Sequence, residues 1–203
     1  TSRSSGRLPG DVAARAWAAV DGDPATFWSP GLLEQRGHWL EFHLPRQTTL
    51  DRLDLVVVAD GRHSVPTRLR IEGDKADVRI VDVPPVADAA PENATAAAPV
   101  RFPSMTTGRV RITVEEVREL RARDFYGGAA NTLPLGIAEV GLPRLVAPTP
   151  DPTIPPICHE GLLTVDGRPV GVRLSGSRAT AERRGAVDFE TCDPGQSARP
   201  DKV

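Results

Sequence analysis

The sequence contains only two cysteines, no long apolar run and no cluster of basic residues, and each absence excludes a class of function. A membrane-spanning helix needs about 20 consecutive apolar residues, and no segment approaches that length. The 25 Lys and Arg residues are interleaved with 27 Asp and Glu residues, so no one-signed basic stripe is available for a nucleic acid. We expect a chain that is soluble as given and binds no nucleic acid.

Common catalytic motifs are missing as well. Neither a serine nucleophile on a G-x-S-x-G elbow nor a zinc site with C-x-x-C spacing occurs, and the four histidines are scattered. Asp124 with Glu115 or Glu116 could form a glycosidase pair, but carboxylates this common lie near one another by chance. We therefore expect a binding module and not an enzyme, with an independent hydrolase as the least favoured class.

A proline-rich stretch near position 150 predicts the domain organisation. Residues 144–157 hold five prolines in fourteen positions, a composition that favours extended, semi-rigid chain. We expect a β-sandwich domain over residues 1–146, a linker over 147–157 and a small β segment over 158–203. The first part is long enough for its own core, whereas roughly fifty residues are too few for a robust one.

Alternation of apolar and polar residues with a period of two predicts that the first domain is built from strands. One short helix is expected over residues 11–20, because alanine dominates there and Asp-Gly-Asp-Pro follows. Residues 84–99 are rich in Pro and Ala without periodicity, so we interpret them as a long surface excursion without chemistry. The expected fold is an all-β jelly-roll sandwich. The predicted strands cover residues 38–44, 49–58, 67–73, 77–83 and 109–117.

The two cysteines, Cys158 and Cys192, lie in the same C-terminal segment. Two strand-like runs flank Asp166-Gly167, a dipeptide typical of a tight hairpin, and a third run follows. In an oxidising compartment the cysteines could close one disulfide, which would stabilise so small a segment. A zinc site formed by both cysteines and His159 is the alternative, but it lacks a clear fourth ligand.

The stretch DGDPAT at residues 21–26 concentrates turn-forming residues and oxygen ligands. Gly22 permits the positive φ that turns carbonyls inward, and Pro24 stiffens the loop. Such a loop suits Ca²⁺, which takes about six to eight oxygen ligands. A solvated surface turn with an N-cap is the alternative that the hexapeptide alone leaves open.

Three motifs together resemble discoidin domains, also called coagulation factor type C domains, and the related galactose-binding-like carbohydrate-binding modules. They are AAVDGDPATFW, which ends at Trp28, the strand WLEFHL, which begins at Trp39, and GIAEVGL around Glu139. The resemblance spans residues 1–146 and implies a β-sandwich that binds sugar through loops. It also implies that both tryptophans are core residues, with a sugar-stacking platform as the alternative for each.

The same resemblance implies a structural calcium ion that ties the two ends of the domain together. Because protein oxygens fill the shell of such an ion, little room is left there for substrate. The implied ligands are the carbonyl of Ala18, the side chain of Asp21, Asp23, both oxygens of Thr26, the carbonyl of Ala138 and the carboxylate of Glu139.

A closer family is indicated by the segment ICHEGLLTVDGRPVGVRLSG, residues 157–176, and by a composition in which only Lys75 and Lys202 are lysines. The chain is similar to the C-terminal periplasmic region of actinobacterial α-(1→3)-arabinofuranosyltransferases, large membrane enzymes that build cell-wall arabinan. This resemblance implies an extracytoplasmic location on the periplasmic or cell-surface side. A fragment of this kind would bind and not transfer.

Three loops are candidates for a sugar site, because loops carry the variable groups of a sandwich. Sugar binding pairs an aromatic face with polar groups that reach several hydroxyls. Galactose-binding relatives commonly use a His and an Arg from such loops, and the second and third loops are the richest. The candidates are Glu34, Arg36 and His38 in residues 29–38; Asp60, Arg62 and His63 in 59–66; and Arg123, Asp124, Phe125 and Tyr126 in 121–132.

The leading hypothesis is a monomeric, non-catalytic, calcium-stabilised carbohydrate-binding module that holds a cell-wall glycan or oligosaccharide near a transferase. The alternative is a structural or adhesion module for a protein or a membrane surface, because a fold does not fix a function. An aromatic face with convergent polar groups would favour sugar, whereas a large exposed apolar patch would favour a partner.

Overall fold

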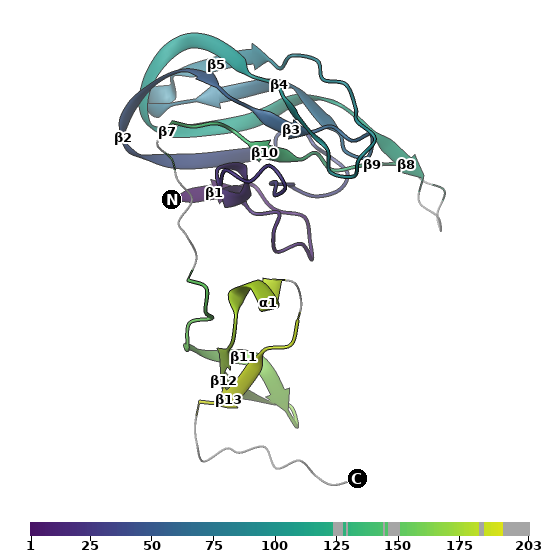
Figure 1. Cartoon of the computed structure of the whole chain (residues 1–203). Coiled ribbons are helices and arrows are strands. Elements are labelled where there is room, and N and C mark those ends of the chain that lie inside the picture. Colours follow the sequence, from purple (N-terminus) through teal and green to yellow (C-terminus); the bar gives the residue numbers. More distant parts are fainter. Residues whose placement is uncertain (124–127, 129, 144, 146–150, 183–184, 193–203) are drawn as a thin grey trace. The chain divides into compact units, whose positions relative to one another are not determined.

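The computed structural model describes residues 1–123, 128, 130–143, 145, 151–182 and 185–192. The chain forms two compact units, Thr1–Ala147 and Pro148–Val203, and each is described by itself (Figure 1). Part of the predicted linker over 147–157 lies outside the described residues, so its extent stays a prediction. Among the described residues, no helix combines the length and the apolar character that crossing a membrane requires.

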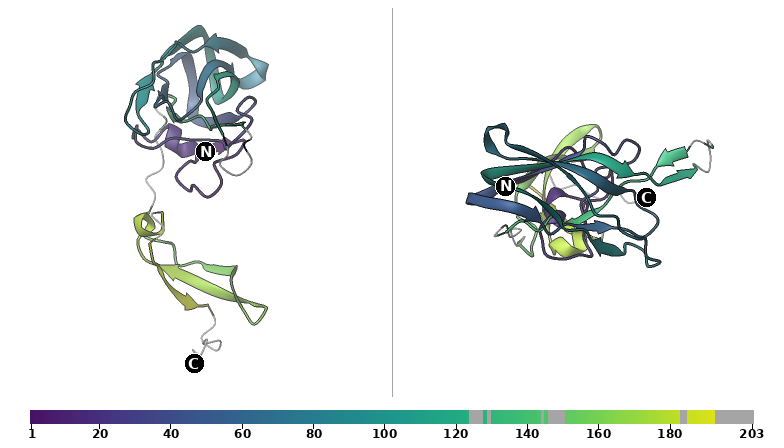
Figure 2. Two further views of the ribbon diagram at one scale, coloured as in Figure 1. Left: turned by 90° about the vertical axis from the view of Figure 1, so that its right-hand side faces the viewer. Right: turned by 90° about the horizontal axis from the view of Figure 1, so that it is seen from above.

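The first unit is built from antiparallel sheets (Figure 1, Figure 2). Its strands are β1 Ser2–Ser4, β2 Trp39–Leu53, β3 Val56–Val58, β4 Val65–Glu72, β5 Val78–Asp82, β6 Thr95–Ala97, β7 Val100–Arg118, β8 Arg121–Arg123, β9 Ala130–Thr132 and β10 Ile137–Glu139. One sheet has the order β1-β2-β7-β4-β5 and another the order β10-β3-β6, while β8 and β9 form a separate hairpin. The described residues of this unit also form two short 3-10 helices, η1 Ala16–Ala19 and η2 Asp74–Ala76. The predicted all-β sandwich is confirmed.

The core of the first unit takes residues from both larger sheets. Leu40 and Phe42 of β2 are fully buried, as the alternation of a half-buried strand predicts. Ile137 of β10 is fully buried as well. Trp28 has no exposed surface, and its indole Nε1 donates a hydrogen bond of 2.9 Å to the carbonyl of Gly6. The predicted core role of Trp28 is therefore confirmed.

Trp39 does not belong to the core, contrary to its predicted role. It alternates with the buried Leu40 on β2 and so lies on the outer face of the five-stranded sheet, where the Arg111 guanidinium stands 4.1 Å from the ring centroid. Arg109 and Arg111 also donate to the carboxylate of Glu41, at 2.8 and 3.0 Å. Burial raises the pKa of Glu41, but these two arginines outweigh it and hold the pKa below its ordinary value.

The predicted helix over residues 11–20 is mostly wrong, because only Ala16–Ala19 form a single 3-10 turn. The side chain of Asp11 accepts a hydrogen bond of 2.8 Å from the N–H of Ala13, which makes a turn there. Ala14 is buried at 1% exposure. Short helices are marginal on their own, so packing of the alanines against the core overrides their helix propensity.

The predicted surface excursion over residues 84–99 is wrong in its last part. Thr95–Ala97 form β6, which pairs with β3 as the edge of the smaller sheet. Ala98 follows it with no exposed surface. A strand of three residues is too short for its alternation to be visible in the sequence.

The second unit is a three-stranded antiparallel sheet with one short helix. Its strands are β11 Cys158–Val165, β12 Arg168–Ser175 and β13 Asp188–Thr191, in the order β11-β12-β13, and α1 spans Arg178–Glu182. Asp166 and Gly167, both with positive φ, form the turn of the predicted hairpin. Cys158 and Cys192 form a disulfide with their Cα atoms 5.9 Å apart. The predicted disulfide is confirmed, and the zinc alternative is wrong because both thiols are used.

Candidate functional site

Asp60 is the centre of the loop that follows β3. Its side chain has no exposed surface and accepts hydrogen bonds from His63 Nδ1 at 3.0 Å and from the N–H groups of Arg62 at 2.8 Å and Asn93 at 2.9 Å. Burial raises the pKa of Asp60, but these hydrogen bonds outweigh it and lower the pKa to about 2. Because an ionised carboxylate only accepts hydrogen bonds, Asp60 favours the tautomer of His63 that carries its proton on Nδ1. The side chain of His63 is 15% exposed.

His63 also packs against Phe27, the residue that follows the DGDPAT loop. The two ring centroids lie 5.4 Å apart at an angle of 81°, an edge-to-face contact. Gly136 makes this packing possible, because a Cβ at that position would lie 2.5 Å from Val58 Cγ2 and 3.0 Å from Phe27 Cδ2. The contact between Phe27 and His63 therefore joins the DGDPAT loop, the calcium-site candidate, to the 59–66 loop, a sugar-site candidate.

Ser64 ties the 59–66 loop to the β8-β9 hairpin. Its Oγ donates to the carbonyl of Leu133 at 2.7 Å and accepts from the N–H of Leu120 at 3.0 Å. Leu120 directly precedes β8 and Leu133 directly follows β9. These two bonds therefore fix the base of the hairpin beside the loop (Figure 1).

Gln35 ties the 29–38 loop to the same region. It is buried at 1% exposure, its Nε2 donates to the carbonyl of Gly31 at 2.9 Å, and its Oε1 accepts from the N–H of Leu135 at 2.9 Å. The N–H of Leu33 donates to the carbonyl of Thr132 in β9 at 3.1 Å. All three loops that the sequence indicated thus lie together in the first unit.

The 84–99 segment joins this region as well, although no chemistry was predicted for it. The carboxylate of Asp88 accepts two hydrogen bonds of 2.7 Å from Arg118, and these are the main cause of a lowered pKa of Asp88. The carboxylate of Glu92 lies 3.7 Å from the guanidinium of Arg62. No local pattern signals such contacts, because the Asp88 pair joins residues 30 positions apart.

The other candidates in these loops have mixed surroundings. Arg62 and Arg123 are exposed. His38 is half-buried and its Nδ1 lies 2.9 Å from a serine hydroxyl near the N-terminus. Glu34 accepts a hydrogen bond of 2.8 Å from the N–H of Arg36 and so caps its own turn. Asp124, Phe125 and Tyr126 lie outside the described residues.

In the DGDPAT loop the oxygen atoms gather around the hydroxyl of Thr26. Thr26 Oγ1 lies 2.8 Å from Asp21 Oδ2 and 3.1 Å from the carbonyl oxygen of Asp23. The N–H of Asp23 donates to Asp21 Oδ1 at 3.0 Å, and the N–H of Ala25 donates to Asp23 Oδ1 at 2.9 Å. Carboxylate, hydroxyl and carbonyl oxygens of this kind are the ligands that Ca²⁺ prefers.

Glu139 reaches this loop from β10. Its Oε1 accepts a hydrogen bond of 2.6 Å from the N–H of Gly22. Burial is the main cause that raises the pKa of Glu139; the hydrogen bond from Gly22 opposes it, and the negative charges of Asp21 and Asp23 add to it. The structure therefore brings three carboxylates close enough to repel one another.

Ala18 and Ala138, whose carbonyls the resemblance adds to the shell, are both buried. They lie on neighbouring segments, because the N–H of Val140 donates to the carbonyl of Ala19 at 2.8 Å. Within the part of the chain that is described, however, no group of three or more His, Cys, Asp or Glu side chains is arranged to hold a metal ion. The donor set fits Ca²⁺ in kind, and calcium binding stays a prediction.

Comparison with known families decides where this unit belongs. Residues 2–151 match the family described as "Arabinofuranosyltransferase D, third carbohydrate binding module". The chain belongs to this family. The matched residues include the calcium-loop candidate and all three sugar-site loops. The predicted relationship to arabinofuranosyltransferases and to discoidin-like carbohydrate-binding modules is confirmed.

Two solved structures of an arabinofuranosyltransferase share the fold at low sequence identity. One of arabinofuranosyltransferase AftD from Mycobacteria matches with 20% identity and a TM-score of 0.60 over 95% of this chain and 15% of that chain. A mutant of the same protein matches with 21% identity and a TM-score of 0.56, again over 95% and 15%. The family 32 carbohydrate-binding module of NanJ from C. perfringens, in complex with galactose, has 16% identity and a TM-score of 0.41 over 68% of this chain and 91% of that one. No curated protein matches the chain.

Proposed function

We propose that the first unit is a non-catalytic module that binds a cell-wall glycan or oligosaccharide beside a membrane arabinofuranosyltransferase. Family membership supports the carbohydrate-binding part of this proposal. The observation that carries the site is the hydrogen bond between buried Asp60 and half-buried His63 in a region where three loops meet. Because the chain spans 15% of the AftD chain that it matches, transferase activity would belong to other parts of such an enzyme.

The ligand would bind at the 59–66 and 121–132 loops. Asp60 holds the His63 ring in one orientation, so the ring loses little conformational entropy when its Nε2 accepts a hydrogen bond from a sugar hydroxyl. Arg62 and Arg123 are exposed guanidinium groups that can each donate to two hydroxyls. Phe125 and Tyr126 belong to the same loop as Arg123 and would supply the apolar surface on which a sugar ring stacks.

We infer an extracytoplasmic location from two observations. The Cys158–Cys192 disulfide is typical of oxidising compartments. The family is named for a module of an arabinofuranosyltransferase. The sequence of this chain resembles the periplasmic region of such enzymes, which build cell-wall arabinan. Formation of the disulfide in protein isolated without added oxidant, with thiols blocked at lysis, would support this location.

We propose further that Ca²⁺ binds where Glu139 meets the DGDPAT loop. Burial first, and then the negative charges of Asp21 and Asp23, raise the pKa of Glu139, and a cation there would offset both effects. Such an ion would hold the loop against β10 and stabilise the folded first unit, without taking part in a reaction or in sugar binding. The proposed ligands are Asp21, Asp23, Thr26, Glu139 and the carbonyls of Ala18 and Ala138.

Calorimetric titration of the 203-residue chain with arabinan and arabinogalactan oligosaccharides tests the sugar site. We expect the wild type to bind, and His63→Ala and Arg62→Ala each to weaken binding by about tenfold, because each removes a hydrogen-bonding group. Arg52→Ala is the matched control: Arg52 is 53% exposed, close to the 57% of Arg62, but it pairs with Asp54 outside the three loops.

Thermal melts first establish that each variant is folded. Wild-type chain that binds neither glycan would overturn the proposal and favour the adhesion alternative. The site assignment alone would be wrong if Arg52→Ala weakened binding as much as Arg62→Ala.

A further inference from the structure

One patch on the outer face of the five-stranded sheet carries more positive than negative charge. Glu41 of β2 pairs with Arg3 of β1 on one side and with Arg111 of β7 on the other, and paired residues lie on the same face of a sheet. Alternation along β2 adds Trp39 and His43 to that face. We call this patch the Trp39 face, and it consists of Arg3, Trp39, Glu41, His43, Arg109 and Arg111.

Glu41 is the acidic member of the Trp39 face, and the arginines around it exceed its charge. Arg109 Nη1 lies 2.8 Å and Arg111 Nη2 lies 2.9 Å from the same oxygen, Oε2 of Glu41. Two guanidinium groups that share one carboxylate repel each other and leave one positive charge unmatched. Arg3 adds a second, because it is exposed and forms no ion pair with another residue that the structure describes. Three arginines minus one glutamate give the patch a formal charge of +2, in a chain whose net charge is −2.

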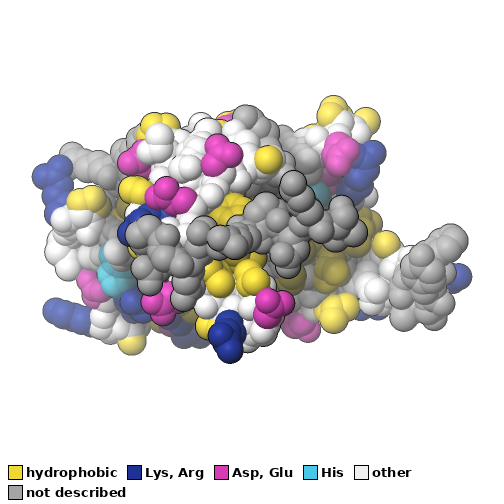
Figure 3. All heavy atoms as spheres, turned by 90° about the horizontal axis from the view of Figure 1, so that it is seen from below, with side chains coloured by type: hydrophobic (Ala, Val, Ile, Leu, Met, Phe, Trp, Pro, Cys, Tyr) yellow, Lys and Arg dark blue, Asp and Glu magenta, His cyan; other side chains and the backbone are white. Residues whose placement is uncertain are grey.

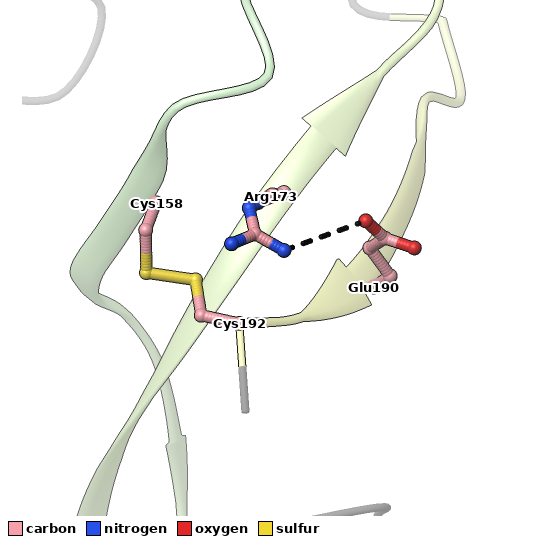
Figure 4. The surroundings of a disulfide bond; sticks show 4 residues. All are labelled: Cys158, Arg173, Glu190 and Cys192. Carbon is pink, nitrogen blue, oxygen red and sulfur yellow. Dashed lines mark ion pairs between the residues drawn. A yellow bond between two sulfur atoms is a disulfide. The ribbon is translucent and has the colours of Figure 1, made fainter. Parts of the chain in front are cut away.

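Arginines at other places of the molecule are matched one to one with carboxylates. Arg70, further along the same sheet face, lies 3.1 Å from Glu72. In the second unit, where the disulfide passes over Gly171, the guanidinium of Arg173 lies 3.8 Å from the carboxylate of Glu190 (Figure 4). A space-filling view shows basic side chains among acidic ones on the face that it presents (Figure 3). The Trp39 face differs from these places in holding three arginines against a single carboxylate.

The side chains of the Trp39 face remain accessible to a ligand. Those of Arg109 and Arg111 are 33% and 35% exposed, and that of His43 is 45% exposed. The indole of Trp39 is half-buried, with the guanidinium of Arg111 4.1 Å from its ring centroid. The part of the indole that stays exposed is therefore an apolar surface beside the arginines.

An anion on the Trp39 face would neutralise its surplus charge. Arginine side chains pair with carboxylate and phosphate groups, and Arg3 and Arg111 extend from the strands on either side of β2, roughly 10 Å apart. An exposed aromatic surface offers apolar contact to a sugar ring. We propose that the Trp39 face binds an acidic sugar unit, whose carboxylate or phosphate pairs with Arg3 and Arg111 while its ring packs on Trp39. The Trp39 face shares no residue with the three sugar-site loops, so this inference does not rest on the proposed function.

Tryptophan fluorescence of the 203-residue chain, titrated with trigalacturonate and with galactose 6-phosphate, tests the site. We expect at least one of these acidic sugars to bind and to change the emission, because the ligand contacts Trp39. The change should disappear in Trp39→Phe and persist in Trp17→Phe. Trp17 is the matched control, because it is also half-buried but packs against the core of the first unit.

Substitution of Arg3 tests the role of charge. Arg3→Ala should weaken binding of the acidic sugar by about fivefold, and Arg3→Glu should abolish it, because the acid group then meets a like charge. Arg3 is exposed, so both variants should fold, and thermal melts verify this. Arg101→Ala is the matched control and should bind like the wild type, because Arg101 is exposed on the same strand β7 but lies opposite Arg52, outside the Trp39 face.

Three results would overturn the proposal. If the folded wild type binds neither acidic sugar, the Trp39 face is not such a site. If galactotriose and galactose, the neutral counterparts, bind equally well, the arginines do not select the ligand. If inorganic phosphate competes as well as galactose 6-phosphate binds, the sugar ring contributes nothing. His63→Ala should keep acidic-sugar binding, so failure of the loop site and failure of the Trp39 face are separate outcomes.

Discussion

Glu139 and Gly22 are joined by a hydrogen bond of 2.6 Å although 117 positions separate them in the sequence. The bond holds one carboxylate against a loop that already carries those of Asp21 and Asp23. Burial and these two charges raise the pKa of Glu139 above its ordinary value of 4.5. A carboxyl group with a higher pKa in the folded than in the unfolded state binds its proton more tightly when the protein is folded. The free energy of unfolding should therefore fall as the pH rises through the folded-state pKa of Glu139.

Glu139→Gln should remove this loss in the absence of calcium. Glutamine keeps an oxygen that accepts from the N–H of Gly22 but carries no charge. In chelator at neutral pH we therefore expect the variant to melt at a higher temperature than the wild type. The difference should disappear below pH 4.5, where the wild-type carboxyl is protonated in both states. Thermal melts across this pH range provide the measurement, and a difference independent of pH would contradict the charge argument.

Calcium should raise the melting temperature of the wild type. A ligand that binds only the folded state adds roughly 4 kcal/mol at a thousandfold excess over its Kd. Glu139→Gln and Asp21→Asn should lose this response, whereas Glu34→Gln, in a different loop, should keep it. Melts in calcium and in chelator measure the effect directly. If the wild type melts at the same temperature in both, the loop is an ordinary turn.

Asp60 should make the first unit sensitive to acid. Its pKa falls from 3.8 to about 2 on folding, so its stabilising effect is complete above pH 3.8 and is lost as the pH falls toward about 2. The shift corresponds to roughly 2 kcal/mol. Asp60→Asn should lower the free energy of unfolding at pH 7 and flatten its decline in acid, as urea titrations at several pH values would measure. An equally steep acid dependence in the variant would show that other carboxylates are responsible.

Reduction of the disulfide should destabilise the second unit and spare the first. Cys158 and Cys192 are 34 positions apart, and closing a loop of that length stabilises the folded state by about 4 kcal/mol in the chain-entropy model. Calorimetry of the wild type and of the double variant Cys158→Ser, Cys192→Ser should show loss of the second unit's transition and an unchanged main transition. A lowered main transition would mean that the two units unfold together.

The sequence was sufficient to predict the burial of residues that belong to a repeating pattern of apolar and polar positions. Leu40 and Phe42 alternate along β2 and are buried as predicted. The same alternation places Trp39 on the opposite face. Its outward position was available from the pattern, whereas the core role came from the family resemblance.

Other parts of the site depend on contacts that no local pattern records. Asp88 meets Arg118, and Asn93 meets Asp60, from a segment whose composition is only Pro-rich and Ala-rich. The backbone of Asn93 has a positive φ of 57°, which the Asn at that position allows. Asn93 is therefore a local sign that the segment turns here.

The structure links the residue types that can occur at positions 158, 171 and 192 during evolution. Because the disulfide runs over its missing side chain, with the nearer sulfur 3.0 Å from where a Cβ would stand, any larger residue there would compete with the bond for the same space. A lineage that loses either cysteine frees position 171 to vary, and a lineage that first replaces the glycine makes both cysteines harder to keep. The glycine and the cysteine pair should therefore be retained or lost as a set, although neither cysteine is adjacent to Gly171 in the sequence.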